Sequence, residues 1–498
     1  MNQIKNSGYS ETGASLTKKS LKSWRPTSYS SKSDLDANLN ILRNRARELS
    51  TTPIGRAAIN TSCIGAISSG LRLYPRINTD ILKVSPEFAR EWARTTKNEF
   101  EMWAGNVQCD FARRNNFYEI QTCLYKSYLR DGDAFCLFRR RLGETYTLKL
   151  QMIEAGRVSN PIYNATGMFN NVEMAGVRKG SRIVNGIEVD RNGRLEAVWI
   201  SNKIWDEPLS ITQPTTTWQR VKVHGDLSGL LNVLHICADN RPDMYRGEPY
   251  LAPVIETLKN VLRYGDAELQ SAIIKSFFSL FFVQPEQNHD INNIITNSDD
   301  DSPCVDPTEY KLAPGTLNAL PRGVDVKSVE SDNAQDTFES FTNSFIAQVG
   351  AALNIPYELL IKKFQSSYSA SKAALLQAEE EFRARRECFI QDFCKPVYEQ
   401  FLIEAISIGR INAPGFFEDP LKRMAWLGCD FRTESNHLLD PVKELQAAKL
   451  KIELGLSTHE HEAATVCGTN WLQNIEDLKI EKKLLAELNS SSTSNNIS

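Results

Sequence analysis

The sequence predicts a mixed α+β protein in which long helices flank a block of short strands. Apolar residues recur at steps of three and four in residues 338–352 and 375–401, which predicts two long amphipathic helices. Residues 134–237 contain runs that alternate apolar and polar side chains between turn residues, which is typical of strands. A polar loop, residues 361–371, separates the two helices.

Composition sets broad limits on the protein. A chain of 498 residues with 41% hydrophobic residues can bury a sizeable core and would divide into two to four domains. Lys and Arg number 58 against 61 Asp and Glu, so the net charge of -3 gives no global signal for binding nucleic acid or an anionic membrane. The longest apolar stretch, residues 272–283, is too short to span a bilayer, and the N-terminus lacks an apolar signal segment. We therefore expect a soluble protein that is intracellular when made and does not bind a membrane.

The ten cysteines show no zinc-ligand spacing, and we interpret them as reduced core residues. The nearest pair is Cys388 and Cys394.

The first half of the chain predicts helices and then strands. Residues 1–34 form a flexible basic arm, and helices follow at 35–50, 53–70, 86–103 and 117–129, with Ser85 capping the third. Asp131 and Asp133 flank Gly132 and are interpreted as turn residues before a strand at 134–138, which pairs with 146–152. Asn192 and Gly193 predict a type I′ hairpin between 187–190 and 195–199, and strands follow at 221–224 and 231–237.

The second half predicts two helices around a polar insertion. The first runs from residue 254 to about 282, and residues 285–332 then become rich in Asn, Asp, Ser and Pro, with short strands at 312–317 and 320–324. The helix that follows ends before Pro356, and a third long helix has Pro396 as a predicted kink. Further helices follow residues 440 and 458, and residues 489–498 form a low-complexity tail. The residues predicted to be buried are Val254, Leu258, Val261, Leu262, Leu269 and Ile273 in the first helix, Phe338, Phe341, Phe345, Val349 and Ala352 in the second, and Leu375, Ala378, Phe382, Phe389, Phe393, Val397 and Phe401 in the third.

Two stretches carry a family resemblance. Residues 241–254, with the sequence RPDMYRGEPYLAPV, and residues 352–376, with ALNIPYELL followed by SYSASKAALL, resemble lambda-type bacteriophage portal proteins. The loop sequence KFQSS before Tyr368 departs from the acidic, Asn-bearing sequence usual in that family. The resemblance implies a ring, usually of twelve copies, at one capsid vertex, through which DNA is packaged and later ejected.

The same resemblance implies a portal-like fold and a division of the chain. It comprises an α/β wing (35–240), a two-helix stem (241–284 and 333–355), a small clip insertion (285–332), a tunnel loop (356–371), a long helix with a return to the wing (372–439) and a helical crown (440–488). The arm (1–34) and a disordered tail (489–498) lie outside these parts.

The sequence shows no catalytic or cofactor site. There is no GxxxxGK[ST] phosphate loop and no GxGxxG fingerprint. His459-Glu-His461 lacks metal-site spacing and indicates an exposed first turn, while Asp299, Asp300, Asp301 and Asp306 indicate a solvated loop. We therefore expect neither enzymatic activity nor a bound metal or cofactor.

The polar loop is the candidate functional site. A loop that joins two long helices projects at their common end, and ring symmetry would bring its copies together around an axis. Its candidate DNA-channel residues are Lys362, Lys363, Gln365, Ser366, Ser367, Ser369 and Lys372. The partners implied are further copies of the chain, the terminase large subunit, a capsid or scaffold protein, a head-tail connector and double-stranded DNA without sequence specificity. The location implied is the virion, with assembly in the host cytoplasm. Two alternatives stay open: a non-viral helical oligomeric scaffold and a nucleic-acid-processing enzyme.

Overall fold

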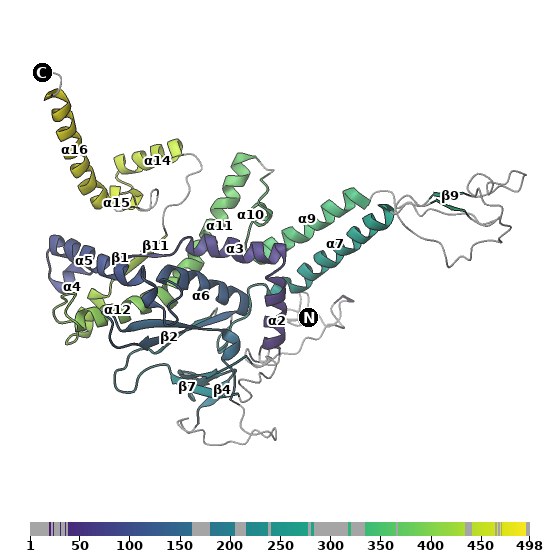
Figure 1. Cartoon of the computed structure of the whole chain (residues 1–498), viewed down its shortest axis with the longest axis horizontal. Coiled ribbons are helices and arrows are strands. Elements are labelled where there is room, and N and C mark those ends of the chain that lie inside the picture. Colours follow the sequence, from purple (N-terminus) through teal and green to yellow (C-terminus); the bar gives the residue numbers. More distant parts are fainter. Residues whose placement is uncertain are drawn as a thin grey trace, which may run out of the picture. The chain divides into compact units, whose positions relative to one another are not determined.

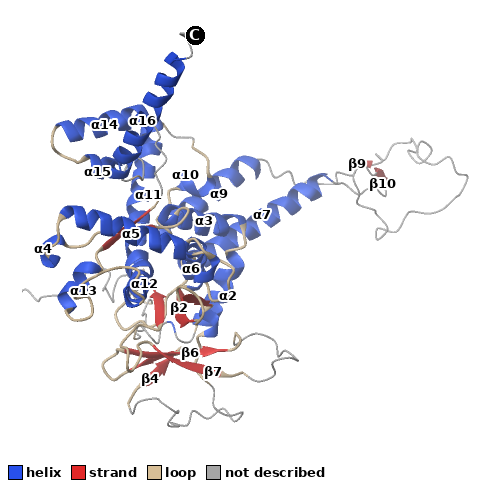
Figure 2. Cartoon of the chain, turned by 60° about the vertical axis from the view of Figure 1, so that its left-hand side comes forward, coloured by secondary structure: helices blue, strands red, loops and turns tan. Residues whose placement is uncertain are grey.

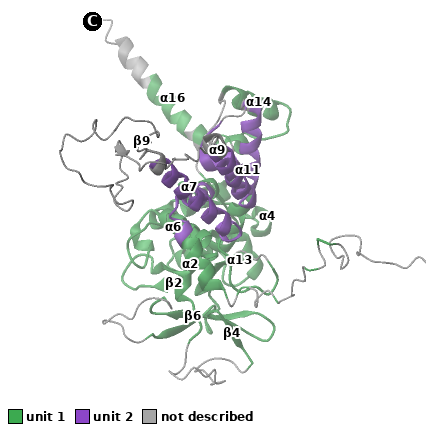
Figure 3. Cartoon of the chain, turned by 90° about the vertical axis from the view of Figure 1, so that its right-hand side faces the viewer, with its two compact units in different colours: residues 1–47, 63–250, 384–498 green, residues 48–62, 251–383 purple. Residues whose placement is uncertain are grey.

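The computed structural model describes residues 19–20, 23, 30, 35, 38–161, 180–204, 216–237, 241–276, 280–282, 317–319, 334–364, 367–433, 441–463, 466, 469 and 471–494. Figure 1 traces these residues from the purple N-terminal end to the yellow C-terminal end. The chain forms two compact units, coloured separately in Figure 3. Unit 1 comprises residues 1–47, 63–250 and 384–498, and unit 2 comprises residues 48–62 and 251–383. Most of the predicted basic arm, the predicted strand at 320–324 and nearly all of the predicted clip lie outside the described residues.

The helices predicted at 53, 86 and 117 begin at those residues, whereas the helix predicted from residue 35 begins at Leu39. Helix α2 spans Leu39–Leu49 and α3 spans Pro53–Ile67, with proline in the first turn, where its missing N–H costs no hydrogen bond. Helix α5 (Pro86–Ala104) is capped by the Ser85 hydroxyl, which accepts from the Phe88 N–H at 3.2 Å. Helix α6 (Phe117–Asp131) starts with a capping box between Asn116 and Glu119. The short helices α4 (Thr79–Leu82) and α13 (Pro420–Trp426) and the 3₁₀ turns η1 (Val107–Cys109) and η2 (Ala155–Arg157) also belong to unit 1, whereas most of α3 belongs to unit 2.

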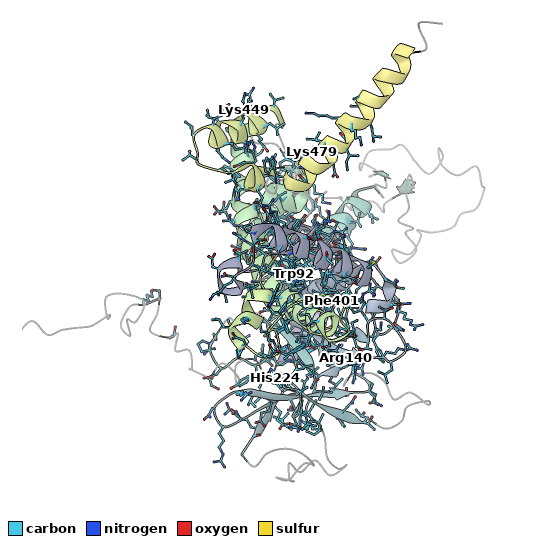
Figure 4. All side chains as sticks on the ribbon, turned by 90° about the vertical axis from the view of Figure 1, so that its left-hand side faces the viewer. Trp92, Arg140, His224, Phe401, Lys449 and Lys479 are labelled. Carbon is cyan, nitrogen blue, oxygen red and sulfur yellow. The ribbon has the colours of Figure 1, made fainter. Side chains whose placement is uncertain are left out.

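The helical core of unit 1 is aromatic. The Phe100 ring lies 5.1–6.4 Å, centroid to centroid, from Trp103, Phe117, Tyr398, Phe401 and Phe431. Three of these partners come from more than 290 positions further along the sequence, so α12 (Lys395–Ser407) and the strand β11 (Cys429–Arg432) complete a core that α5 and α6 begin. Figure 4 labels Phe401 and Trp92 among these helices.

One long helical segment crosses from unit 2 into unit 1. It consists of α11 (Tyr368–Phe389), a π-helical turn η5 (Ile390–Cys394) and α12 (Lys395–Ser407). Pro396 has no N–H to donate to the Asp392 carbonyl, and the wider π turn precedes it, which is how helices often absorb such a break. The predicted apolar stripe is confirmed from Ala378 to Phe401, whereas Leu375 is only half-buried.

Two sheets face a shared apolar cluster in unit 1. The first has the order β3-β2-β8, from Leu148–Ile153, Asp133–Arg140 and Val233–Cys237. The second has the order β4-β5-β6-β7, from Arg182–Val184, Ile187–Val189, Leu195–Ser201 and Trp218–Lys222 (Figure 2). All neighbouring strands in both sheets are antiparallel, and buried residues of both sheets form one core cluster. A further antiparallel pair joins β1 (Arg72–Pro75) to β11 (Cys429–Arg432).

The hairpin between β5 and β6 differs from the prediction. Gly193 has a positive φ of 86°, but Asn192 does not, so the turn is not type I′. The Asp190 N–H donates to the Arg194 carbonyl and the Gly193 N–H to the Asp190 carbonyl, which leaves three residues in the loop. A three-residue loop of this kind places glycine at a bulge, and the register does shift between Glu188 and Val189.

Unit 2 is mainly helical. After the 3₁₀ turn η3 (Ala252–Val254), α7 (Ile255–Ser276) lies beside α9 (Ala334–Ala352), and α10 (Tyr357–Ile361) follows (Figure 1). The Tyr264 ring lies 5.4 Å from Phe338 and 4.5 Å from Phe341.

The prediction of a fully buried stripe on these helices is wrong in part. Leu269, Ile273 and Phe341 are 61%, 43% and 40% exposed, and Ala352 is exposed as well. Val254, Leu258 and Val349 are buried as predicted. The reason is that α7 and α9 each turn only part of their apolar surface toward the other.

The remaining elements lie at the insertion and the C-terminus. Strands β9 (Leu280–Phe282) and β10 (Leu317–Ala319) pair in parallel; β9 lies just before the predicted clip and β10 lies inside it. Helix α14 (Pro441–Glu453) ends near Gly455, whose φ is 71°, and α15 (His459–Glu462) is capped by Thr458. Helix α16 (Trp471–Ser494) extends beyond residue 489, where the sequence predicts the start of the tail. Figure 4 labels Lys449 and Lys479 on α14 and α16. Over the described part of the chain, no helix is both long and apolar enough to cross a membrane.

The cysteines are not all core residues. Cys63, Cys109, Cys136 and Cys394 are buried free thiols, as predicted, but Cys123 and Cys388 are exposed. Both exposed thiols lie on the solvent side of amphipathic helices, a distinction that residue type alone cannot make.

Candidate functional site

The predicted channel loop begins where α9 stops. Asn354 takes a left-handed conformation with φ of 54°, and the Ile355 N–H donates 2.9 Å back to the Gly350 carbonyl. The Asn354 N–H reaches the Ala351 carbonyl at 3.4 Å, which completes a Schellman motif. A Cβ on Gly350 would lie 2.6 Å from the Ile355 oxygen, so glycine is the residue that fits this helix end.

A short helix occupies the start of the region predicted as loop. Pro356 precedes α10, Leu360 is buried, and the Tyr357 hydroxyl donates to the Asn343 amide oxygen on α9 at 2.8 Å. Lys362 ends α10 with φ of 56°. The prediction of a continuous loop over 356–371 is therefore wrong at both ends, because α11 already begins at Tyr368. The Ser367 hydroxyl accepts from the Ala370 N–H at 3.4 Å and so supplies an N-terminal cap for α11.

The candidate channel residues fall into three groups. Lys362, Lys363 and Ser367 are exposed loop residues, whereas Ser369 and Lys372 belong to the first turns of α11. Gln365 and Ser366 lie outside the described residues. The Lys363 ammonium lies 3.9 Å from the Glu339 carboxylate, and both side chains are more than half exposed, so this ion pair contributes little to stability.

Unit 1 also contains a buried ion cluster, centred on Asp133. Asp133 opens β2, and its carboxylate is fully buried between Arg43 of α2 and Arg246. The Arg43 guanidinium donates to Asp133 Oδ1 and to the Asp131 carbonyl, each at 2.8 Å. His235 of β8 lies with Nε2 3.3 Å from Asp133 Oδ2.

Arg246 connects this cluster to three backbone carbonyls. Its guanidinium donates to both Asp133 oxygens and to the carbonyls of Val158, Ala155 and Asn185, the first two at 2.9 Å. Charge-assisted bonds of this kind are stronger than neutral ones, and a planar guanidinium can make several at once. Arg246 therefore fixes β2, η2 and the turn between β4 and β5 relative to one another.

Two glycines allow this approach. If Gly132 carried a Cβ, that atom would lie 2.3 Å from the Gly247 carbonyl oxygen. If Gly247 carried one, it would lie 1.8 Å from the Gly132 carbonyl oxygen. Gly132 also has φ of 85°, a conformation that favours glycine. The segment carrying Arg246 can thus lie directly against the turn that carries Asp133.

The cluster shifts the titration of its members. Burial by itself would raise the pKa of Asp133, but the charges of Arg246 and Arg43 and the hydrogen bond with His235 outweigh it and hold that pKa well below its usual range. Burial, together with the charge of Arg246, lowers the pKa of Arg43 to about 10. Asp133 and Arg43 therefore remain charged at neutral pH.

The interpretation of Asp131 and Asp133 as simple turn residues is wrong. Asp133 holds the cluster, and Asp131 pairs with Arg47 at 2.6 Å while 2% exposed. The sequence did contain two signals of this cluster. Arg43 and Arg47 are four positions apart, which places both charges on one face of α2, and Arg246 lies inside the 241–254 motif. Sequence spacing alone could not show that Asp133 contacts Arg43, which lies 90 positions earlier, and Arg246, which lies 113 positions later.

The described residues include only part of the metal-ligand candidates considered in the sequence. His459 and His461 occupy the exposed first turn of α15, as predicted. Nowhere in the described ranges do three His, Cys, Asp or Glu side chains gather as metal ligands. The acidic residues 299–301 and 306 lie outside those ranges.

Comparison with known proteins gives a consistent set of relatives. Portal protein B of Escherichia phage lambda is 25% identical over 474 residues, covering 89% of this chain and 84% of the relative. The portal protein of Escherichia phage N15 is 24% identical over 475 residues, with the same coverage. Among solved structures, the neck of a native GTA particle computed with C12 symmetry matches 86% of this chain and 92% of the other, at 10% identity and a TM-score of 0.40. The virion of a native gene transfer agent particle matches the same shares at 9% identity and a TM-score of 0.37.

The family assignment rests on sequence. The model of the family described as "Phage portal protein, lambda family" matches residues 17–386. That range contains both stretches that carry the resemblance, together with Arg43, Asp133 and Arg246. The chain belongs to the lambda family of phage portal proteins.

Proposed function

We propose that this portal protein forms a closed ring with DNA passing along its axis, and that unit 2 supplies both subunit contacts and the channel loop. The family assignment supports a place at one vertex of a phage capsid, in packaging and ejection of DNA. The observation that carries the proposal further is the apolar surface that unit 2 leaves uncovered.

That surface lies on the two helices of the predicted stem. Leu269 and Ile273 are one helical turn apart on α7, so their exposed side chains share a face. Phe341 on α9 is 40% exposed although its ring touches Tyr264 and Phe345. Exposed apolar side chains at helical spacing are typical of helices that bind other subunits.

The assembly can be tested by mass photometry of the purified chain. Leu269→Glu with Ile273→Glu should convert rings to smaller species, because a carboxylate buried at an interface without a partner is strongly unfavourable. Leu142→Glu is the matched control, since Leu142 is 89% exposed in unit 1. A wild-type chain that stays monomeric across salt concentrations would contradict the ring.

The loop has the chemistry of a sequence-independent channel. Lys362 and Lys363 are adjacent exposed cations, and Ser367 and Ser369 present hydroxyls 3.2 Å from each other at the start of α11. Such groups contact phosphates without reading bases. The weak Lys363–Glu339 pair leaves the ammonium able to exchange partners as DNA slides.

The loop assignment predicts a defect in DNA handling with intact assembly. Lys362→Glu with Lys363→Glu should reduce packaged DNA, more at low than at high ionic strength, because salt screens charges on exposed residues. Lys83→Glu with Lys422→Glu makes the same change in charge on exposed residues of unit 1. Unchanged packaging by the loop variant, or an equal loss by the control, would refute the assignment.

We also propose docking roles for the segments around the stem. Residues 285–332 would meet the terminase large subunit and a head-tail connector, and the wing would meet capsid or scaffold protein. The polar composition of 285–332 supports a surface module, and β10 inside this segment pairs with β9, which lies just before it. Replacing residues 285–332 with a short linker should leave soluble rings that cannot package DNA, whereas aggregation would show that the segment belongs to the core.

A further inference from the structure

Unit 1 contains a cavity whose walls carry an excess of positive charge. Its volume is about 760 Å³, enough for several phosphate groups and their water. One wall is α5, another is the β1–β11 pair, and the third is the C-terminal segment around Thr458, His461 and Asn474. Five cations face two acids, Asp430 and Glu460; the cations are Arg76, Arg90, Arg94, Lys97 and Arg432.

The cations on α5 form a fixed row. Arg90, Arg94 and Lys97 follow the i, i+4, i+7 spacing of one helix face, so their Cα atoms rise about 6 Å and then about 4.5 Å along the axis. The opposite face of α5 holds the row in place. There the Trp92 indole donates to the Asn412 carbonyl at 2.9 Å, and its ring lies 5.0 Å from Trp426.

The second row lies on the strand pair. Arg432 and Arg76 flank Asp430, with nitrogen–oxygen distances of 3.4 and 3.9 Å. One carboxylate thus faces two guanidinium groups, and its side chain is 43% exposed, so it neutralises this row only in part.

Tyr74 lies between the rows. The Lys97 ammonium is 4.4 Å from the ring centroid and the Arg432 guanidinium 5.0 Å from it. Burial, and after it the charge of Arg72, lowers the pKa of Lys97 although Glu101 opposes the shift. An anion that binds beside a partly desolvated cation stabilises the charged form of that cation.

We propose that this basic groove, defined by Arg76, Arg90, Arg94, Lys97 and Arg432, binds the phosphodiester backbone of nucleic acid. Arginine predominates, and its planar fork matches phosphate oxygens in pairs. Duplex DNA carries a charge about every 1.7 Å of its axis, so a rigid row of cations meets phosphates at any register. The site is distant in sequence from the channel loop and does not depend on it.

An acidic protein segment is the competing occupant, and the lining disfavours it. Interfaces between proteins centre on apolar or aromatic anchors in desolvated pockets. Among the described residues that line the groove, the aromatic rings are those of Tyr74 and His461. Two cations already lie against the Tyr74 ring. The groove thus offers positive charge but no apolar or aromatic pocket for a side chain, which is typical of sites that bind the nucleic-acid backbone without reading its sequence.

The test is fluorescence anisotropy of a labelled 20-base-pair duplex with the full-length assembly over a range of salt. Arg90→Glu with Arg94→Glu should weaken binding by about tenfold or more and lower the log–log salt slope by roughly 2, because each phosphate that no longer meets a cation lowers the slope by about 0.9. Arg114→Glu with Arg130→Glu is the control, because these arginines are exposed outside the groove and change the net charge equally. Its affinity should stay within about twofold of the wild type.

Further measurements separate the possible outcomes. Circular dichroism and particle mass should be unchanged in both variants, since all four arginines are exposed. Pyrophosphate should compete with the duplex only at millimolar concentration, whereas tighter binding of pyrophosphate than of the duplex would identify a small-anion site and overturn the proposal. Equal losses in the two double variants, or stronger competition by poly-glutamate than by unlabelled duplex, would also overturn it. The Lys362→Glu, Lys363→Glu variant should still bind the duplex at the basic groove. A failure of the channel-loop assignment can therefore be distinguished from a failure of the groove proposal.

Discussion

Removing the Arg246 guanidinium should destabilise unit 1 strongly. Arg246→Ala deletes the partner of both Asp133 oxygens and of three backbone carbonyls. Breaking a buried ion pair from one side costs about 3–5 kcal/mol. Arg43 still pairs with Asp133, which limits the loss, while the carbonyls lose their donors at a cost of about 1–3 kcal/mol each if water does not replace them. We therefore expect the free energy of unfolding to fall by about 4 kcal/mol.

The measurement is urea unfolding of the full chain, followed by tryptophan fluorescence at a fixed protomer concentration. A decrease of this size shifts the midpoint without preventing folding, because domains of this kind are stable by about 5–15 kcal/mol. Arg246→Lys should lose roughly half as much, since it keeps the charge but not the fork. Arg76→Ala is the control, because Arg76 is 81% exposed, and it should change stability by no more than about 0.5 kcal/mol.

The reasoning would be refuted if Arg246→Ala cost less than about 1 kcal/mol, or no more than Arg76→Ala. Either result would mean that the cluster is retained for something other than the stability of unit 1. A large loss for Arg246→Lys equal to that of Arg246→Ala would show that geometry, and not charge, accounts for the whole effect.

Acid titration, glycine substitution and thiol labelling test three other features. Because the pKa of Asp133 lies far below that of an unfolded aspartate, its contribution to stability is present above about pH 4 and lost as pH falls below it, so the acid-side slope of unfolding free energy should be shallower in Asp133→Asn than in the wild type. Gly247→Ala should destabilise unit 1, whereas Gly265→Ala, in open space on α7, should add up to about 1 kcal/mol of helix stability; equal effects would contradict the close approach to Gly132. Iodoacetamide at pH 8 should label exposed Cys388 and leave Cys63 unmodified, because burial raises the pKa of the Cys63 thiol to about 11; mass spectrometry of tryptic peptides checks this.

Local signals predicted most of the elements. Pro53, Ser85 and the aromatic spacing on the predicted long helix each act within a few residues, and the helices begin and bury their faces accordingly. The exceptions are also local in cause. A three-residue loop between Asp190 and Arg194, with a register shift between Glu188 and Val189, replaces the type I′ turn, and the Asn-Gly dipeptide alone cannot distinguish the two arrangements.

Burial and long-range pairing were harder to predict. A helical stripe indicates which residues share a face but not how much of that face a single chain covers, and so Leu269 and Phe341 were wrongly predicted to be buried. In the same way, Asp133 carries no local sign of the two arginines that reach it from distant segments. The structure shows that Lys362 and Lys363 are exposed, and their role in a DNA channel remains a prediction.

The ion cluster also orders events during synthesis of the chain. Asp133 leaves the ribosome 90 residues after Arg43 and 113 residues before Arg246. At roughly 5–20 residues per second, about 6–20 s pass before the second guanidinium exists. During that interval Asp133 must stay hydrated or accept Arg43 alone, because burying a carboxylate without full pairing is strongly unfavourable. The edge of β2 next to Gly132 can therefore close only late, after the 241–254 motif has been made, and the β3-β2-β8 sheet is complete only once the chain has reached the start of α7.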